Sequence, residues 1–235
     1  MNSWPKVIAP IDPGMQRICD EFMEEWHKKL GGHLGFIDRF NHAFVLKNSQ
    51  VDWRRTLDLG AGLGEHFAFE ALPDSKIDQY QMVEVRRNMA EGIRARFPQA
   101  RILISDCQER LPYPDGYYDR ILAIHVLEHL PRLPDCLDEV KRLLCKRTGK
   151  FLVLIPCEGG ALYTIARRCS AQRYFEKTYR IPYEVFIKRE HINLADEIIR
   201  ELKKRFAVQK TSFFPFRIPS IALNLFIGLV CSPQR

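Results

Sequence analysis

The sequence lacks any run of apolar residues approaching the ~20 that a helix needs to cross a bilayer. Its amino terminus has no charged-then-apolar pattern of a secretory signal, and no internal repeat or low-complexity segment is present. The most apolar stretch, residues 218–231, is too short to span a membrane and is interrupted by Pro219 and Asn224. We therefore expect an aromatic-rich loop followed by a buried strand there, in a protein located in the cytoplasm.

Cysteine pairs of the kind that hold zinc ribbons are also absent. The seven cysteines are scattered, odd in number and never spaced as C-x-x-C. This pattern argues against a disulfide framework and for reduced thiols, in agreement with a cytoplasmic location. The sequence also shows no Ser-His-Asp or Cys-His arrangement that would indicate nucleophilic catalysis.

The composition is that of one ordinary α/β domain with additions. The 235 residues are 46% hydrophobic and 28% charged, enough to bury a sizeable core. The formal net charge of +7 suits an acidic substrate, a nucleic acid or an anionic membrane. A simple gain in solubility explains this charge equally well.

Hydrophobic periodicity predicts an alternation of strands and helices. Strands are expected at residues 55–59, 79–85, 101–105, 120–124, 151–155, 207–213 and 225–231. Helices are expected at residues 15–30, 35–47, 65–72, 88–97, 134–145 and 193–206. The first helix should end at the pair Gly31-Gly32. Regular alternation over the middle of the chain implies a parallel sheet with right-handed crossovers.

Residues 56–65, Thr-Leu-Asp-Leu-Gly-Ala-Gly-Leu-Gly-Glu, join an apolar strand to a helical pattern. Gly60, Gly62 and Gly64 can adopt backbone angles closed to other residues, and they let a ligand approach the main chain. We expect the helix that follows to direct its free N–H groups at that ligand. Asp58, still in the strand, can hold the turn together.

The spacing D-x-G-x-G-x-G resembles the first motif of the class I methyltransferases that bind S-adenosylmethionine. A dinucleotide fingerprint needs a third glycine where this chain has Glu65, which argues against an NAD-linked oxidoreductase. Residues 111–130, which include Leu127-Glu128-His129-Leu130, resemble the fourth-strand motif of a large branch of the same superfamily. Residues 137–144 resemble the helix before strand five, although the family often has Pro-Gly-Gly where residues 147–150 read Arg-Thr-Gly-Lys.

This resemblance, which covers roughly residues 51–156, implies an α/β fold. We expect a doubly wound, mostly parallel, seven-stranded Rossmann-like sheet with an antiparallel last strand. One compact domain should contain an N-terminal helical cap (1–50), a cofactor-binding half (51–157), and a substrate-side insert with the C-terminal strands (158–235). The two N-terminal helices either form a lid over the sheet edge or pack as ordinary core helices.

The resemblance also implies S-adenosyl-L-methionine as the cofactor, bound at the carboxyl ends of the first four strands. The expected cofactor-binding residues are Asp58, Gly60, Ala61, Gly62, Gly64, Glu84, Asp106, Cys107 and His125. Glu84 can accept hydrogen bonds from both ribose hydroxyls, and Asp106 with Cys107 stands where the family contacts the adenine. A solvated strand-end charge for Glu84 and a turn cap for Asp106 are the alternatives.

The segment His125-Val126-Leu127-Glu128-His129 matches H-x-x-E-H, a zinc-peptidase signature. That chemistry needs both histidines one turn apart on a continuous helix. Because His125 stands at the end of a predicted strand, we expect no metal site. Glu128 and His129 should instead cap and orient a short helix, while His125 faces the cofactor end of the sheet.

Methyl transfer from a sulfonium is an in-line displacement that needs alignment and, for some acceptors, a general base. His125, His129 and His191 are candidate bases, each with a structural alternative, and we take His125 and His191 as the catalytic candidates. His191 follows the insert after strand five and can face the pocket from above. A non-catalytic methyltransferase-like scaffold is the alternative to an enzyme.

The insert at residues 158–190 interleaves cations with aromatic residues. This mixture suits a phosphorylated sugar, a nucleotide- or lipid-linked glycan, or RNA, and equally a solvated amphipathic lid. We expect a small-molecule, glycan or lipid-linked acceptor. An RNA-directed methyltransferase is the alternative, and it ranks second because no recognisable RNA-binding module flanks the domain. Residues 213–222 are a candidate for peripheral membrane contact, and the sequence predicts no oligomeric state.

Overall fold

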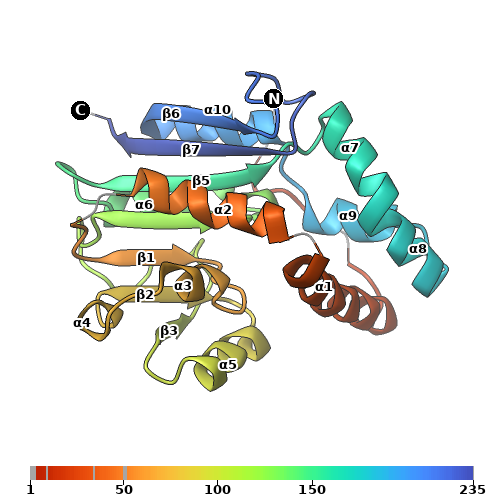
Figure 1. The fold of residues 1–235 in the computed structure, drawn as a ribbon, viewed down its shortest axis with the longest axis horizontal. Helices are drawn as coiled ribbons and strands as arrows, with labels where there is room; N and C mark the ends of the chain where they lie inside the picture. The colour runs from red at the N-terminus through yellow and green to blue at the C-terminus, as the bar shows by residue number, and fades with distance from the viewer. Residues whose placement is uncertain (1–3, 9, 34, 50–51, 235) are drawn as a thin grey trace.

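The computed structural model describes residues 4–8, 10–33, 35–49 and 52–234, whose strands form one sheet in the order β3-β2-β1-β4-β5-β7-β6 (Figure 1). The strands are β1 (Thr56–Leu59), β2 (Tyr80–Glu84), β3 (Arg101–Ile104), β4 (Arg120–Ile124), β5 (Lys150–Pro156), β6 (Phe206–Phe214) and β7 (Phe226–Pro233). Strands β1 to β5 pair in parallel, and β7 runs antiparallel to both β5 and β6. The predicted doubly wound, seven-stranded sheet with an antiparallel last strand is confirmed.

The helices follow the predicted alternation, with departures that include three helices in the insert at residues 158–190 for which no bounds were predicted. They are α1 (Pro13–His33), α2 (Gly35–Asn48), α3 (Glu65–Glu70), α4 (Asp74–Ile77), α5 (Arg87–Arg96), α6 (Leu133–Leu143), α7 (Ala161–Arg167), α8 (Arg173–Tyr179), α9 (Glu184–Glu190) and α10 (Ala195–Arg205). The short α4 was not predicted. The predicted stop at Gly31-Gly32 is wrong, because α1 continues to His33. Glycine weakens a helix by about 1 kcal/mol relative to alanine but does not forbid it.

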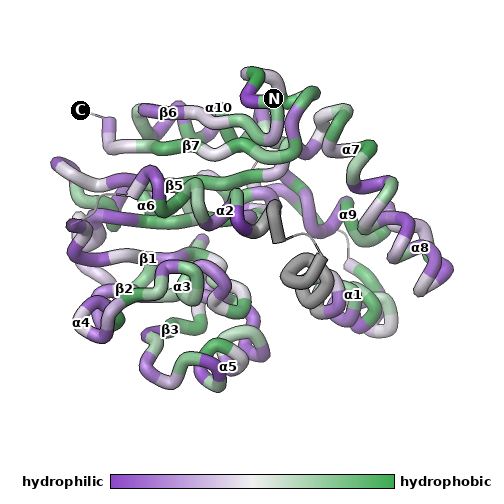
Figure 2. The backbone as a smooth tube through the Cα atoms, in the orientation of Figure 1, coloured by the Kyte–Doolittle hydropathy of each residue, from purple (hydrophilic) through white to green (hydrophobic). Residues whose placement is uncertain are grey.

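Each face of the sheet has its own hydrophobic core because side chains alternate along a strand. On β4 and β5, Ile121 and Val153 pack on the face covered by α6 and α10. Leu122 and Leu154 pack on the opposite face, against α2, α3 and α5. The inner strands β5 and β7 are accordingly hydrophobic along most of their length (Figure 2).

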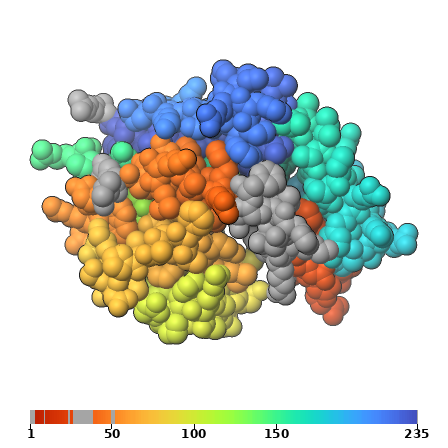
Figure 3. Space-filling view, in the orientation of Figure 1, coloured from red at the N-terminus to blue at the C-terminus, as the bar shows by residue number. Residues whose placement is uncertain are grey.

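The two N-terminal helices have different roles. Phe44 and Val45 of α2 are buried in the second core, so α2 packs as an ordinary helix on the face of the sheet. Phe22 of α1 instead packs against Phe175 of α8 and Phe186 of α9, with ring centroids 5.0 and 4.7 Å away. We call α1, α8 and α9 the end cap, and it lies beyond the carboxyl ends of the parallel strands (Figure 1). In the space-filling view these segments form one end of the molecule (Figure 3). The predicted lid therefore consists of α1 with the insert helices.

The apolar C-terminal run forms a loop and then β7, which is hydrogen-bonded on both sides. Asn224 is fully buried, and its Nδ2 donates to the carbonyls of Ile218 and Ser220 at 2.8 Å each. Its Oδ1 accepts from the Phe216 amide at 3.0 Å. Among the described residues, no helix is both long enough and apolar enough to cross a membrane.

The close approach of α2 to β7 depends on Gly228. A Cβ at this position would lie 2.6 Å from Cε2 and Cζ of the Phe44 ring. We expect Gly228→Ala to lower the free energy of unfolding by about 1–3 kcal/mol, because overpacking must displace the ring. Urea unfolding measures this loss. The double variant with Phe44→Leu should lose less than the sum of the two single variants, and strict additivity would contradict the proposed clash.

Candidate functional site

The glycine turn is a tightly hydrogen-bonded loop between β1 and α3. Gly60, Gly62 and Gly64 have φ values of +62°, +59° and +78°, which side-chain-bearing residues rarely adopt. The amides of Gly60 and Ala61 both donate to the Val83 carbonyl, at 2.8 and 3.1 Å. The amides of residues 60–64 in the turn are already paired within the protein, and helix α3 has only six residues. That the first amides of α3 face a ligand stays a prediction.

Glu84 holds the turn from the neighbouring strand. Its Oε2 accepts from the Gly62 amide and its Oε1 from the Arg86 amide, both at 2.9 Å, and the residue is 5% exposed. Glu84 is therefore a buried, oriented carboxylate rather than a solvated strand-end charge. Each oxygen keeps a further lone pair that a ribose hydroxyl could use.

Asp106 and Cys107 lie in the loop after β3. Asp106 accepts from the backbone amide of Gln108 at 2.8 Å and from its side-chain amide at 3.0 Å, and lies 3.5 Å from the Arg132 guanidinium. It thus caps its own turn, as the alternative interpretation expected. Cys107 is buried with its Sγ 3.8 Å from that of Cys136.

A cavity of about 760 Å³ lies between the strand ends and the end cap. Of the predicted cofactor residues, Asp58, Gly60, Ala61, Gly62 and His125 line it, whereas Gly64, Glu84, Asp106 and Cys107 do not. Aromatic side chains form much of its far wall, namely Phe22, Trp26, Tyr163, Tyr183, Phe186 and Phe226. The structure therefore brings the glycine turn and the insert to one space.

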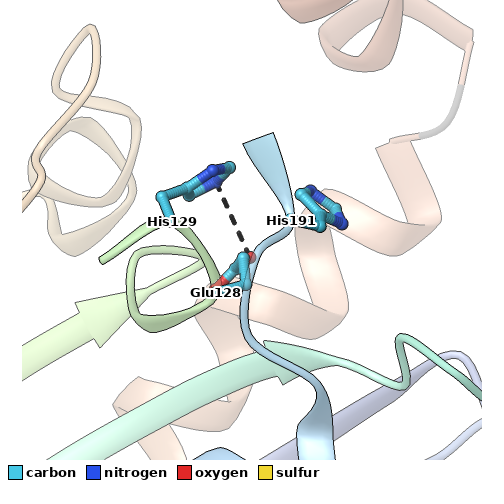
Figure 4. Close-up of side chains that lie close together, drawn as sticks. All are labelled: Glu128, His129 and His191. Carbon is cyan, nitrogen blue, oxygen red and sulfur yellow. Dashed lines mark ion pairs between the residues drawn. The ribbon is translucent and has the colours of Figure 1, made fainter. Parts of the chain in front are cut away.

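The predicted histidines meet at the end of β4. His125 has a φ of +55°, and its Nδ1 lies 3.4 Å from Oε1 of Glu128. The rings of His129 and His191 lie with their centroids 5.1 Å apart (Figure 4). His191 lines the cavity, as predicted, and its Nδ1 lies 2.8 Å from Oε2 of Glu158.

Asn193 connects the segment that contains His191 to the segment that follows β4, more than 60 residues earlier in the sequence. It is fully buried, and its Nδ2 donates to the carbonyls of Leu127 and Leu130 at 2.8 Å each. Its own amide donates to the Glu128 carbonyl at 3.0 Å. These bonds fasten the chain after α9 to the 3-10 helix Leu127–His129, so that His191 lies beside Glu128 and His129.

Sequence reasoning missed several residues of the cavity region. Glu158 and Glu190 were not predicted as site residues, although each lies within 3.5 Å of a histidine in this cluster. His42 and His66 also line the cavity, with their Nδ1 atoms 3.1 Å apart. Burial and the neighbouring histidines lower the pKa of His42 to about 4. No local pattern marks these residues, because their partners come from distant segments.

Asp58 carries a buried carboxyl at the base of the cavity. It is 3% exposed and accepts from the Tyr80 hydroxyl at 2.7 Å. Burial raises its pKa from the ordinary 3.8 to about 6, although the charge of His66 and the Tyr80 hydrogen bond act in the opposite direction. The folded protein thus retains a proton that the unfolded chain has already released.

Because the pKa of Asp58 is higher in the folded protein, we expect this residue to lower the free energy of unfolding by an amount that depends on pH. The native state binds more protons between about pH 4 and about pH 6, so stability falls as the pH rises through this window and levels off above it. The gap between the folded and unfolded pKa values corresponds to about 3 kcal/mol. Urea unfolding of Asp58→Asn should lack this slope, so the variant should gain on the wild type by up to that amount. A difference between the two proteins that does not change with pH would contradict burial as the cause.

Comparison with known proteins bears on the family and the fold of the chain. Residues 57–153 match the sequence model of a family described as Methyltransferase domain. The sterol 4-C-methyltransferase strm-1 of Caenorhabditis elegans is 31% identical over 103 residues, which are 41% of this chain and 29% of that protein. The chain thus spans less than a third of the length of that curated relative.

Two solved structures share the fold. A possible histamine N-methyltransferase from Thermotoga maritima has a TM-score of 0.64 at 19% identity, covering 93% of this chain and 99% of that one. A methyltransferase from Archaeoglobus fulgidus that depends on S-adenosylmethionine has a TM-score of 0.60 at 17% identity, covering 89% and 98%. Residues 57–153 therefore resemble the family described as Methyltransferase domain, and the chain shares the fold of these two solved structures.

Proposed function

We propose that this protein transfers a methyl group from S-adenosylmethionine to a small-molecule acceptor. One observation carries the proposal: Gly60, Ala61 and Gly62 line the same cavity as His125 and His191. A cofactor end and an acceptor end therefore share one space of about 760 Å³, within the usual range for ligand pockets. A non-catalytic scaffold would be expected to have this space filled by side chains. The open cavity therefore favours an enzyme over a scaffold.

The cofactor-binding half would be residues 51–157, with the binding residues proposed from the sequence. The bare peptide of Gly60 and Gly62 would lie against the methionine portion, because no Cβ blocks the approach. Glu84, which already orients Gly62, would accept the ribose hydroxyls. Asp106 and Cys107 would lie near the adenine, with Asp106 held in place by Gln108.

The cofactor supplies its own activated methyl group, so the protein's task is to align the acceptor and, where needed, remove its proton. His125 and His191 are proposed for this task because both line the cavity. The left-handed backbone of His125 is a strained conformation of the kind that clusters at functional sites. Residues 158–235 would supply the acceptor side.

The cavity favours a largely apolar acceptor with a hydroxyl or amine at its reacting end. Its aromatic wall offers apolar surface, and its lining includes four carboxylates, those of Asp58, Glu65, Glu128 and Glu190. Arg96 and Arg167 are the guanidiniums of the lining, and Arg167 lies 4.0 Å from the Glu158 carboxylate. This balance supports a neutral small molecule or lipid over the phosphorylated or glycan-linked acceptor that the insert's cations suggested.

Two further features support an acceptor delivered from a lipid phase. Phe216 is 60% exposed, and Ile218 and Leu223 are each 48% exposed, in and beside the loop proposed for membrane contact (213–222). The curated relative from C. elegans is named for a sterol, which is a lipid, and for methylation at its carbon 4. A cytoplasmic location is part of this proposal, because all seven cysteines are free.

Cofactor binding can be tested with a pair of glycine variants. In Gly60→Ala, the new Cβ would lie 2.6 Å from Cγ2 of Val126, at a φ of +62°. Displacing the turn should weaken S-adenosylhomocysteine binding at least about tenfold, which corresponds to about 1.4 kcal/mol. In Gly92→Ala, the Cβ would meet only the end of the Leu63 side chain at 3.2 Å, and binding should persist.

Calorimetry measures both affinities, and circular dichroism checks that each variant is folded. If the folded wild-type protein does not bind S-adenosylhomocysteine at millimolar concentrations, the proposed function is wrong.

The acceptor class can be found by transfer of a tritiated methyl group into a fractionated native extract. We expect the label in the organic-extractable fraction, since the cavity wall is aromatic and carries excess carboxylates. Label in the aqueous small-molecule fraction would favour the phosphorylated acceptor. Label in RNA would favour the RNA-directed alternative, and either result would contradict the apolar acceptor.

A further inference from the structure

Three potential metal ligands converge at the acceptor end of the cavity. Glu128, His129 and His191 each offer one ligand atom, and these atoms all lie within 4.8 Å of one another (Figure 4). They come from two segments, the 3-10 helix after β4 and the residue that follows α9. All three line the cavity, so an ion held there would face the bound ligand.

Glu128 has a buried oxygen that lacks a partner. The residue is 1% exposed, and its Oε2 has no hydrogen-bond partner among the described residues. Its Oε1 lies 3.4 Å from Nδ1 of His125. A buried carboxylate oxygen without a donor is unfavourable, because it has lost its water without gaining a replacement. This oxygen therefore indicates a positive group that would complete the site.

His191 is held in the tautomer that a metal ligand requires. Its Nδ1 lies 2.8 Å from Oε2 of Glu158, and a carboxylate can only accept, so Nδ1 carries the proton. The lone pair is then left on Nε2. A carboxylate that orients a histidine in this way is the usual outer partner of a metal-bound imidazole. Glu158 is itself buried, at 8% exposure, which keeps this contact away from water.

We propose that Glu128, His129 and His191 bind one divalent transition-metal ion, with zinc as the first candidate. One carboxylate with two imidazoles is a donor set of catalytic zinc sites, which keep a further position open. Magnesium and calcium prefer all-oxygen ligand sets, so this mixture disfavours them. The ligands differ from those of the H-x-x-E-H motif, because β4 ends at Ile124 and His191 takes the place of His125.

The open position gives the ion a role that rests on the proposed function. An acceptor hydroxyl bound there would have a lower pKa and would release its proton to water or to a nearby histidine. The oxygen would then form the new O–C bond while the C–S bond of the sulfonium breaks, and the electron pair of that bond stays on sulfur. Binding of the ion itself does not depend on this role.

The test titrates the full-length, chelator-treated protein with zinc chloride in a calorimeter and with cobalt chloride in a spectrophotometer. We expect one equivalent of each metal, with visible cobalt absorption from a site of low coordination number. His191→Ala should abolish or strongly weaken binding. Glu158→Gln keeps all three ligands but loses the orienting carboxylate, so it should weaken binding by about 10–100-fold. Magnesium chloride should not compete.

Two control variants separate this site from adventitious binding. Cys145→Ser with Cys169→Ser removes the two thiols that are not buried, and His42→Asn removes another cavity histidine. Both should bind the metal as the wild type does. Folding of each variant is checked by circular dichroism, and because Glu128→Gln could fail to fold, His191→Ala is the deciding variant.

The proposal is wrong if the folded wild type binds no zinc or cobalt, or if folded His191→Ala binds the metal as tightly as the wild type does. Binding of S-adenosylhomocysteine is measured separately on the metal-free protein. A protein that binds this nucleoside but no metal would overturn the metal site and leave the proposed function intact.

Discussion

The side-chain amide of Asn193 joins the two halves of the site. Its hydrogen bonds to the Leu127 and Leu130 carbonyls are buried, so breaking them would leave polar groups without partners and without water. The C-terminal part of the chain is held against the end of β4 by these bonds. This attachment places His191 beside the Glu128–His129 pair, together with the contact of Glu190 with His129.

A second feature of the structure is the number of ionisable groups buried around the cavity. The chain of contacts from His42 to His66 and Glu70 ends at Arg120, whose Nη1 lies 2.7 Å from Oε1 of Glu70. Asp58 and Glu128 add buried carboxylates. Buried charges contribute little net stability, since the loss of hydration offsets their mutual attraction. Their concentration near one cavity is what is expected of a functional site.

The sequence allowed most of the sheet to be predicted, because hydrophobic alternation and the glycine turn are local signals. The limits of β4, residues 120–124, were predicted without error. Errors arose where a local signal was overridden or absent. The pair Gly31-Gly32 does not end α1, and α4 is too short for a periodic pattern to show. The side-chain roles within the site were harder, since Asp106 caps its own turn.

The sequence by itself determined the fold class, the glycine turn and the identity of the residues at the ends of β1, β2 and β4. Parallel strands place their carboxyl ends at one edge, so these residues had to lie near one another. Only the tertiary structure decided that α1 would close the cavity with α8 and α9, and that His191 would join Glu128 and His129. The contacts of His191 link segments that are more than 60 residues apart in the sequence. They depend on tertiary packing and on the hydrogen bonds of Asn193, and no local sequence pattern indicates either.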